Sequence, residues 1–196
     1  MGAPSNSSRL ALAVLVTLLA RTATSDEPAA SVPPAKQATI LLRALAYDRN
    51  LQARSGGTVN IAILTKSGDS RSEAMALAMT EAFKALESAS VAGLPMRIVT
   101  LSQGDMKSLE QAVANQGVDT LYVCDGLDSE IPSIKAISRR RKVITMGSRE
   151  QYLVQGLSLG VFAIAGRNVL ELNLQSSREE GVAFSTEMVG LAHIIN

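Results

Sequence analysis

The sequence predicts an α/β fold, a three-layer α/β/α sandwich around a mostly parallel, Rossmann-like sheet with an antiparallel C-terminal hairpin. Two observations predict it. Four short apolar segments rich in β-branched residues alternate with segments of helical periodicity, the pattern of βαβ units whose sheet is covered on both faces. After the fourth segment, the pattern changes to two strands around Gly166-Arg167-Asn168, which is a tight-turn signal.

The first 25 residues are predicted to be a secretory signal peptide. Arg9 precedes an apolar run over residues 10–20, which is too short for a membrane-spanning helix of roughly twenty residues. Small residues at Ala23 and Ser25 place the cleavage site after Ser25. We therefore expect an exported, periplasmic protein with no stable membrane anchor.

A linker rich in Pro and Ala is predicted over residues 26–35, followed by a single domain over residues 36–196. The domain is expected to begin with a helix over residues 36–53, in which Leu41 and Leu45 belong to an apolar stripe beside charged positions. This helix lies outside the α/β alternation. We therefore expect it to pack on a partner protein or on a second copy of the chain.

The α/β alternation follows this first helix. The capping box Ser70-Arg-Ser-Glu73 predicts the start of a helix, in which Met75, Met79 and Phe83 recur at helical spacing. Strands are predicted over residues 59–64, 96–101, 120–124 and 143–146. Further helices are predicted to begin at Asp105, Pro132 and Ser148.

The C-terminal part is predicted to leave the parallel pattern. Two strands over residues 157–165 and 169–174 form the hairpin, and the second alternates leucines with polar residues, so one of its faces is polar. A closing helix is expected to begin at a capping box that starts at Ser177 and to continue to Ile195.

Composition and motifs exclude several classes of function. The 19 Lys and Arg residues nearly balance the 18 Asp and Glu residues, and the chain has three Tyr, three Phe and no Trp, so no nucleic-acid partner is predicted. Cys124 and His193 are the sole residues of their types, and one Cys with one distant His does not favour a zinc site. Phosphate-binding glycine motifs and a nucleophile elbow are absent, so no metal, cofactor or catalytic residue is predicted.

Small polar residues follow the predicted strands, at the end of a parallel sheet where ligands usually bind. The candidate ligand-binding residues there are Ser67, Ser102, Asp125, Ser148 and Arg149. The simpler interpretation is that these residue types cap helices and turn the chain. Asp125 is the carboxylate most suggestive of chemistry, but catalysis needs a partner group with a tuned pKa, and the sole His lies near the C-terminus.

A basic run covers residues 139–142 and has two interpretations. It is either a solvated helix end, where cations complement the helix dipole, or a docking patch for an acidic partner or anionic lipid headgroups. The candidate partner-binding residues of the whole chain are Leu41, Leu45, Arg139, Arg140 and Arg141.

Five stretches of the chain carry a family resemblance. They are RALAYDRNL at 43–51, TLYVCD at 120–125, ITMG at 144–147, LSLGVF at 157–162, and a tail from 172 to 192 that contains GVAFS at 181–185. Together with the order of the elements, they resemble the YfiR family over nearly all of residues 36–195.

This resemblance implies a small periplasmic protein without known catalytic activity, whose type member represses a membrane-bound diguanylate cyclase. The first hypothesis is a non-enzymatic regulator that binds and represses an inner-membrane signalling protein with a periplasmic domain, by resemblance in cyclic-di-GMP signalling. A homodimer is a further candidate assembly. The alternative hypothesis is a periplasmic small-ligand binding protein with a cleft at the carboxyl ends of the parallel strands. An enzyme with a site at Asp125 ranks third.

Overall fold

The computed structural model describes residue 2, residues 31–103 and residues 106–195. The predicted signal peptide (apart from residue 2) and the first half of the predicted linker lie outside the described residues. The strands are β1 (Val59–Lys66), β2 (Met96–Gln103), β3 (Thr120–Val123), β4 (Ile144–Gly147), β5 (Leu159–Ile164), β6 (Arg167–Asn173) and β7 (His193–Ile195). The helices are α1 (Pro34–Leu45), α2 (Leu51–Ser55), α3 (Ser70–Lys84), α4 (Met106–Asn115), α5 (Ile131–Arg141), α6 (Glu150–Val154), α7 (Leu174–Glu179) and α8 (Thr186–Leu191).

In this part of the chain, seven strands form one sheet in the order β2-β1-β3-β4-β5-β6-β7. All neighbouring strands are parallel except β5 and β6, which form the predicted antiparallel hairpin. The predicted mostly parallel α/β sheet is therefore confirmed. The hairpin does not end the sheet, because β7 pairs with β6 in parallel and forms the outer edge. No helix among the described residues has the length and apolar character to cross a membrane.

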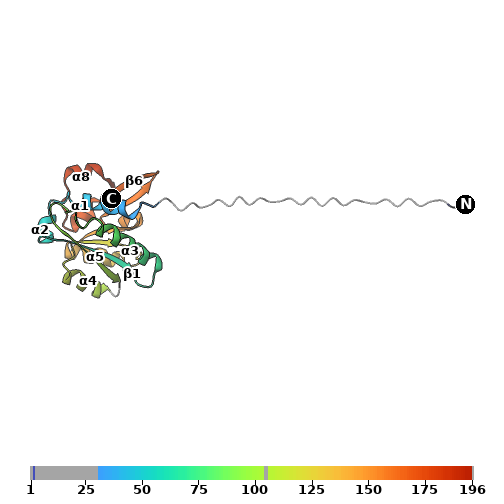
Figure 1. Ribbon diagram of the computed structural model, residues 1–196, viewed down its shortest axis with the longest axis horizontal. Helices are drawn as coiled ribbons and strands as arrows, with labels where there is room; N and C mark the ends of the chain where they lie inside the picture. The colour runs from blue at the N-terminus through green and yellow to red at the C-terminus, as the bar shows by residue number, and fades with distance from the viewer. Residues whose placement is uncertain (1, 3–30, 104–105, 196) are drawn as a thin grey trace.

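Helices cover both faces of the sheet, as Figure 1 shows. The central strand β1 illustrates why, because its side chains alternate between two apolar clusters. Ile61 and Ile63 belong to the cluster that α1 and α3 complete. Ala62 and Leu64 belong to the cluster that α4, α5 and α6 complete. A strand buried on both faces favours apolar residues at successive positions, which accounts for the continuous apolar run over residues 61–64.

The first helix is shorter than predicted and begins earlier. Pro34 and Ala35, predicted to end the linker, are the first residues of α1, where proline is well tolerated because the first helical N–H has no partner within the helix. The predicted helix over 36–53 is broken by a turn over 46–50, and α2 begins at Leu51.

This turn is held by the segment that follows α7. The Arg49 N–H donates to the Ala183 carbonyl at 3.1 Å, and the Ser185 N–H donates to the Tyr47 carbonyl at 3.1 Å. Between these bonds, a carboxylate oxygen of Asp48 accepts from the Ala183 N–H at 2.9 Å, across 135 residues of sequence. Two of the stretches that carry the family resemblance therefore lie side by side and close the fold.

The predicted closing helix over 177–195 is wrong. Asn173, not Ser177, caps α7, because its side chain accepts from the Ser176 N–H. The helix ends at Glu179, and the backbone then turns through Gly181, whose φ of +85° strongly favours glycine. The short helix α8 and strand β7 follow, and β7 finds its place only through pairing with β6.

Candidate functional site

A polar cleft of about 670 Å³ lies where β1, β3 and β4 end. Its residues come from the loops that follow these strands. Asp69 caps α3 by accepting from the Ser72 N–H at 2.9 Å, so Asp69 and not the predicted Ser70 is the capping residue. The cleft is lined by Gly68, Asp69, Ser70, Arg71, Asp125, Gly126, Asp128 and Arg149.

Three of the five predicted ligand-binding residues meet at this cleft. Asp125 and Arg149 line it, and the Ser148 hydroxyl donates to the Asp125 carboxylate at 2.6 Å. Arg149 donates to the carboxylate of Asp128 at 2.7 Å, and both side chains of this pair are about half exposed. Arg149 and Asp128 are therefore already paired with each other and face solvent.

The other two predicted residues do not line the cleft. Ser67 and Ser102 are exposed, and Ser102 lies on the edge strand β2, one strand beyond β1. Conversely, Asp69, Arg71 and Asp128 line the cleft but were not among the predicted site residues. Their position in the sequence could have indicated them, because they lie in a loop that follows a strand or in the first turn of a helix.

The buried groups behind the cleft remain protonated near neutral pH. Burial, together with a smaller contribution from the neighbouring Asp125 carboxylate, raises the pKa of the Cys124 thiol to about 12. Burial also raises the pKa of Tyr152 to about 12, and its hydroxyl donates to Asp128 at 3.2 Å. The described residues contain no cluster of His, Cys, Asp and Glu arranged for a metal ion. The cleft can therefore offer charged groups and hydrogen bonds to a ligand.

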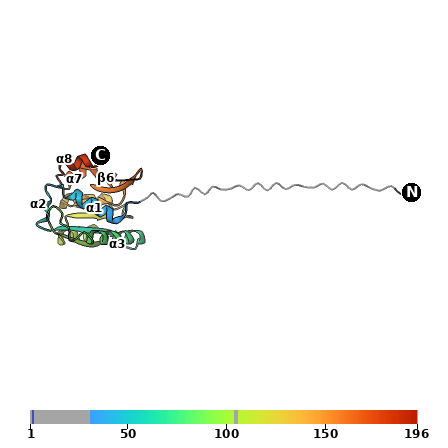
Figure 2. The ribbon, with the colours of Figure 1, turned by 45° about the horizontal axis from the view of Figure 1, so that its top comes forward.

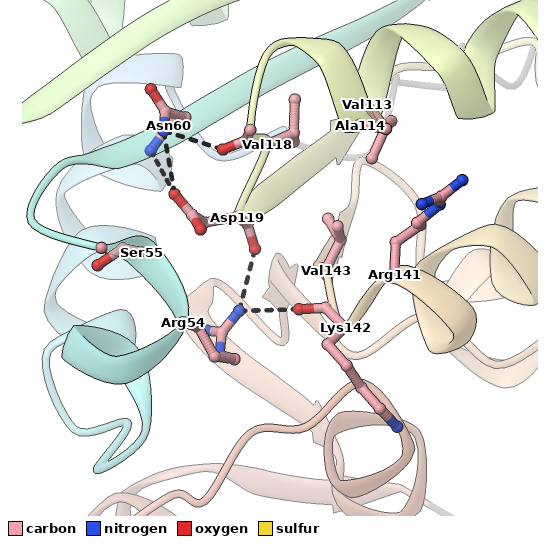
Figure 3. A pocket seen from close by; sticks show the side chains of 12 residues that line it. Arg54, Ser55, Asn60, Val113, Ala114, Val118, Asp119, Arg141, Lys142 and Val143 are labelled. Carbon is pink, nitrogen blue, oxygen red and sulfur yellow. Dashed lines mark hydrogen bonds between the residues drawn. The ribbon is translucent and has the colours of Figure 1, made fainter.

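A second hollow, of about 470 Å³, lies at the opposite end of the sheet. Figure 3 shows Arg54 pointing at the carbonyl oxygens of Asp119 and Lys142, to which it donates at 3.2 and 3.1 Å. The same guanidinium donates to the Asp48 carboxylate at 2.8 Å, and the two side chains are only 10% and 0% exposed. Arg54 thus fastens the α1–α2 turn to the start of β3 and to the end of α5.

Asp119 and Asn60, two other polar residues of this hollow, also bond to the backbone. The Asp119 carboxylate accepts from the Asn60 N–H at 2.8 Å, and the Asn60 side chain donates to the Gly117 carbonyl at 2.9 Å (Figure 3). Burial raises the pKa of Asp119, and the hydrogen bonds from Asn60 oppose that shift. Because the hydrogen bonds of these groups fix the ends of strands and helices, we assign the polar groups of this hollow a structural role.

The basic run at the end of α5 is largely paired. Arg140 binds the Glu110 carboxylate through two hydrogen bonds of 2.9 and 2.8 Å, and Arg141 donates to the same carboxylate at 3.0 Å. Arg139 pairs with Glu179. Two carboxylates from other helices therefore offset half of the positive charge of residues 139–142. This arrangement favours the interpretation as a solvated, paired helix end.

The first helix buries the residues that were expected to meet a partner. Leu41 and Leu45 are fully buried in the apolar cluster beneath α1, so the prediction that they form an outward apolar surface is wrong. The helix uses its strongest apolar stripe for the domain's own core. Its outer side contributes to a different feature, a largely apolar groove of about 570 Å³ against β6 and α8. The groove is lined by Ile40, Arg43, Ala44, Ala46, Tyr47, Asn168, Leu170, Met188 and Leu191.

The model of the YfiR/HmsC-like family matches residues 35–193. The chain belongs to the YfiR/HmsC-like family. YfiR/HmsC-like membership supports a periplasmic regulator. No curated protein matches the sequence at a significant level.

Solved structures share the fold at low sequence identity. An ABC domain from Streptococcus pneumoniae in complex with L-Trp is 12% identical with a TM-score of 0.59, covering 84% of this chain and 62% of that one. A conserved domain protein from Vibrio cholerae is 15% identical with a TM-score of 0.58, covering 84% and 60%. A ligand-free, open substrate-binding protein with adhesive properties from Clostridium difficile is 12% identical with a TM-score of 0.53, covering 75% and 57%. This YfiR/HmsC-like chain spans about three fifths of their lengths, and the likeness shows the fold alone.

Proposed function

We propose that this protein binds the periplasmic part of an inner-membrane signalling protein and represses it, and that the target is a diguanylate cyclase. The observation that carries the proposal is the family match over residues 35–193, which includes every strand and helix of the described domain except the end of β7 and the first residue of α1. The diguanylate cyclase enters through the resemblance to the type member. Export by the predicted signal peptide is part of this proposal.

The groove between α1, β6 and α8 is the surface that we assign to this contact. Leu191 at its rim is 65% exposed, one of the most exposed large apolar side chains among the described residues. Arg43 is exposed and has no ion pair within the described part of the chain. It also borders a smaller hollow of about 270 Å³ on the other side of α1. A partner segment that is apolar and places a carboxylate opposite Arg43 fits this surface.

Replacing Leu191 with Asp is expected to weaken partner binding by about tenfold or more, because a carboxylate then enters an apolar contact. The partner is first recovered by crosslinking the tagged protein in its native cell envelope and identified by mass spectrometry. Binding of the purified periplasmic domain is then measured by calorimetry. Val154→Asp is the matched control, because Val154 is 61% exposed on α6, away from the groove.

Repression is measured as cyclic-di-GMP formation by membranes that contain the recovered protein. Addition of the purified protein is expected to lower the rate, and Leu191→Asp is expected to lower it less. A recovered membrane protein whose activity does not change would contradict repression. Equal binding by Leu191→Asp and the parent protein would contradict the assigned groove.

A second candidate function is small-ligand binding in the cleft at the carboxyl ends of β1, β3 and β4. The specific observation is the meeting of carboxylates with Arg71 and Arg149 around one hollow, which suits a ligand with both an ammonium and a carboxylate group. The Streptococcus pneumoniae neighbour holds L-Trp, so amino acids are the first ligands to test.

Binding of an amino acid is expected to raise the melting temperature by several degrees at saturating ligand, because a ligand that binds only the folded state stabilises it. A thermal-shift panel of the twenty amino acids measures this. Arg149→Ala is expected to abolish the shift. Arg167→Ala, at the start of β6 and outside the cleft, is the control. No shift at millimolar concentrations would remove this candidate.

A further inference from the structure

Glu180 is a carboxylic acid that the fold encloses completely. It follows α7 and is fully buried. Its side chain contacts three elements, because Ser138 of α5, Thr145 of β4 and Ser158 just before β5 all hydrogen-bond to it. These partners are hydroxyl groups and one backbone N–H, and none of them carries a charge. Since burying a carboxylate without a cation is costly, this side chain favours its neutral form in the folded protein.

The charged side chains around Glu180 have other partners. β4 and β5 contain no charged residue. Arg178 of α7 is exposed, and the Glu179 carboxylate pairs with α5. The basic residues of α5 and its C-cap bind Glu110, Glu179 or backbone carbonyls, and they are Lys135, Arg139, Arg140, Arg141 and Lys142. Within the described part of the chain, Glu180 therefore has no cation to stabilise its ionised form.

The contacts of Ser138 indicate where the proton of Glu180 lies. The Ser138 hydroxyl is 2.9 Å from Oε1 of Glu180 and 3.0 Å from the Lys135 carbonyl oxygen. A serine hydroxyl has one hydrogen and cannot donate to both acceptors. When Glu180 is protonated, it donates to Ser138, and Ser138 donates to Lys135. The neutral acid thus satisfies both contacts, whereas the ionised form leaves Ser138 with one hydrogen for two acceptors.

The residues next to Glu180 hold the turn between α1 and α2. The Gly181 carbonyl accepts from the Asn50 side chain at 3.0 Å, and the Ala183 N–H donates to the Asp48 carboxylate at 2.9 Å. Because the Glu180 side chain is enclosed between α5, β4 and β5, it can reach water only if the backbone that carries it moves. Ionisation therefore acts first on the segment that follows Glu180.

The same segment leads into α8, which forms one wall of the groove between α1, β6 and α8. The helix begins directly after Ser185, and its residues Met188 and Leu191 line the groove. Figure 2 shows α7 and α8 on the side of α1 away from α3. A displacement of residues 181–185 therefore moves α8 relative to α1 and changes the shape of the groove.

We propose that Glu180 makes the groove proton-dependent. The neutral acid keeps residues 181–185 and α8 in place for partner binding, and ionisation of the acid releases them. The effect on repression rests on the proposed function, whereas the release itself is a property of the isolated protein. A regulator of this kind binds its target in a mildly acidic medium and releases it in a mildly alkaline one.

Hydrogen exchange of the purified protein, measured by mass spectrometry, tests this release without a partner. After correction for the intrinsic pH dependence of exchange, the amides of residues 183–192 are expected to lose about tenfold in protection between about pH 6 and about pH 8. The factor follows from proton linkage, because the carboxyl group has a pKa of about 7 when enclosed and an ordinary value of 4.5 when released. The amides of β1 are expected to stay more protected at both pH values, because the release is local. Equal protection of the two segments would indicate unfolding of the whole domain and overturn the proposal.

Three variants assign the response to Glu180. Glu180→Gln is expected to remove it, because the amide stays neutral at every pH, and Glu179→Gln is the adjacent control that is expected to keep it. His193→Gln is also expected to keep it, which matters because histidine side chains change charge between about pH 5 and 8 and His193 is the sole histidine. Circular dichroism of each variant confirms the fold. A parent protein without the response, or a Glu180→Gln variant that retains it, would overturn the proposal.

The effect on the groove is measured with the recovered partner. Its affinity, measured by calorimetry, is expected to fall about tenfold between the same pH values for the parent protein and for Glu179→Gln, and to stay constant for Glu180→Gln. Constant affinity of the parent protein, despite release in the exchange experiment, would overturn the coupling to the groove. If no membrane partner is recovered, the proposed function fails, and hydrogen exchange still decides whether Glu180 controls residues 181–185.

Discussion

Arg54→Met is expected to lower the free energy of unfolding by about 3–5 kcal/mol, the usual cost of removing one partner of a buried ion pair. The Asp48 carboxylate would remain fully buried without its cation, and the carbonyls of Asp119 and Lys142 would lose their donor. Methionine has a similar length and keeps the apolar packing of the arginine stem. Urea denaturation measures the effect, as a lower midpoint with an unchanged slope.

Arg141→Met is the matched control, because Arg141 lines the same hollow but is 43% exposed in a surface pair with Glu110. Its expected effect is at most about 1 kcal/mol. The double variant Asp48→Asn with Arg54→Met is expected to lose less than the sum of the two single losses, since both act on one pair. Equal losses for Arg54→Met and Arg141→Met would contradict the role of Arg54 as the fastening residue.

Stability is expected to fall as the pH rises from about 4.5 through about 7, by on the order of 3 kcal/mol, because of Glu180. This carboxyl group is fully buried, and burial raises its pKa to about 7 from an ordinary value of 4.5. Hydrogen bonds from Ser158 (2.5 Å), Thr145 (2.7 and 2.9 Å) and Ser138 (2.9 Å) oppose that shift. No described cation pairs with it.

The direction follows from proton binding. Between these two pH values the folded state holds a proton on Glu180 that the unfolded chain releases, so its stabilising contribution is full below about 4.5 and lost above about 7. Urea denaturation at several pH values measures the slope. Glu180→Gln is expected to flatten this component, whereas Glu179→Gln, in the partly exposed pair with Arg139, is expected to keep it. A parent protein with no such component, or a Glu180→Gln variant that retains it, would contradict the assignment.

The fold was predictable where local pattern decides structure. The predicted strands over 59–64 and 96–101 each lie within the observed strands, because short segments rich in apolar and β-branched residues favour strands. The α5 helix was predictable from the helical spacing of its apolar residues. The β5–β6 hairpin was predictable from the turn signal at Gly166. Each of these signals lies within about ten consecutive residues.

The errors lie where distant segments meet. The break after Leu45 depends on hydrogen bonds to Ala183, and β7 depends on pairing with β6, so neither has a signal within its own few residues. Leu41 and Leu45 were correctly placed on an apolar stripe, but periodicity does not tell whether the stripe meets the domain's own core or a partner. The pairing of Arg140 with Glu110 likewise joins α5 to α4, which no spacing along the chain reveals.

The hydrogen bonds between the α1–α2 turn and residues 181–185 constrain the order in which the chain can fold. The contacts of Asp48 and Asn50 with Ala183 and Gly181 close loops of 135 and 131 residues, which carry a high entropic cost before any of their energy is recovered. The turn after α1 therefore cannot reach its final position until almost the entire polypeptide is present. A growing chain can pack α1 on α3 early, but it leaves the α1–α2 turn without these hydrogen bonds until residues 181–185 arrive.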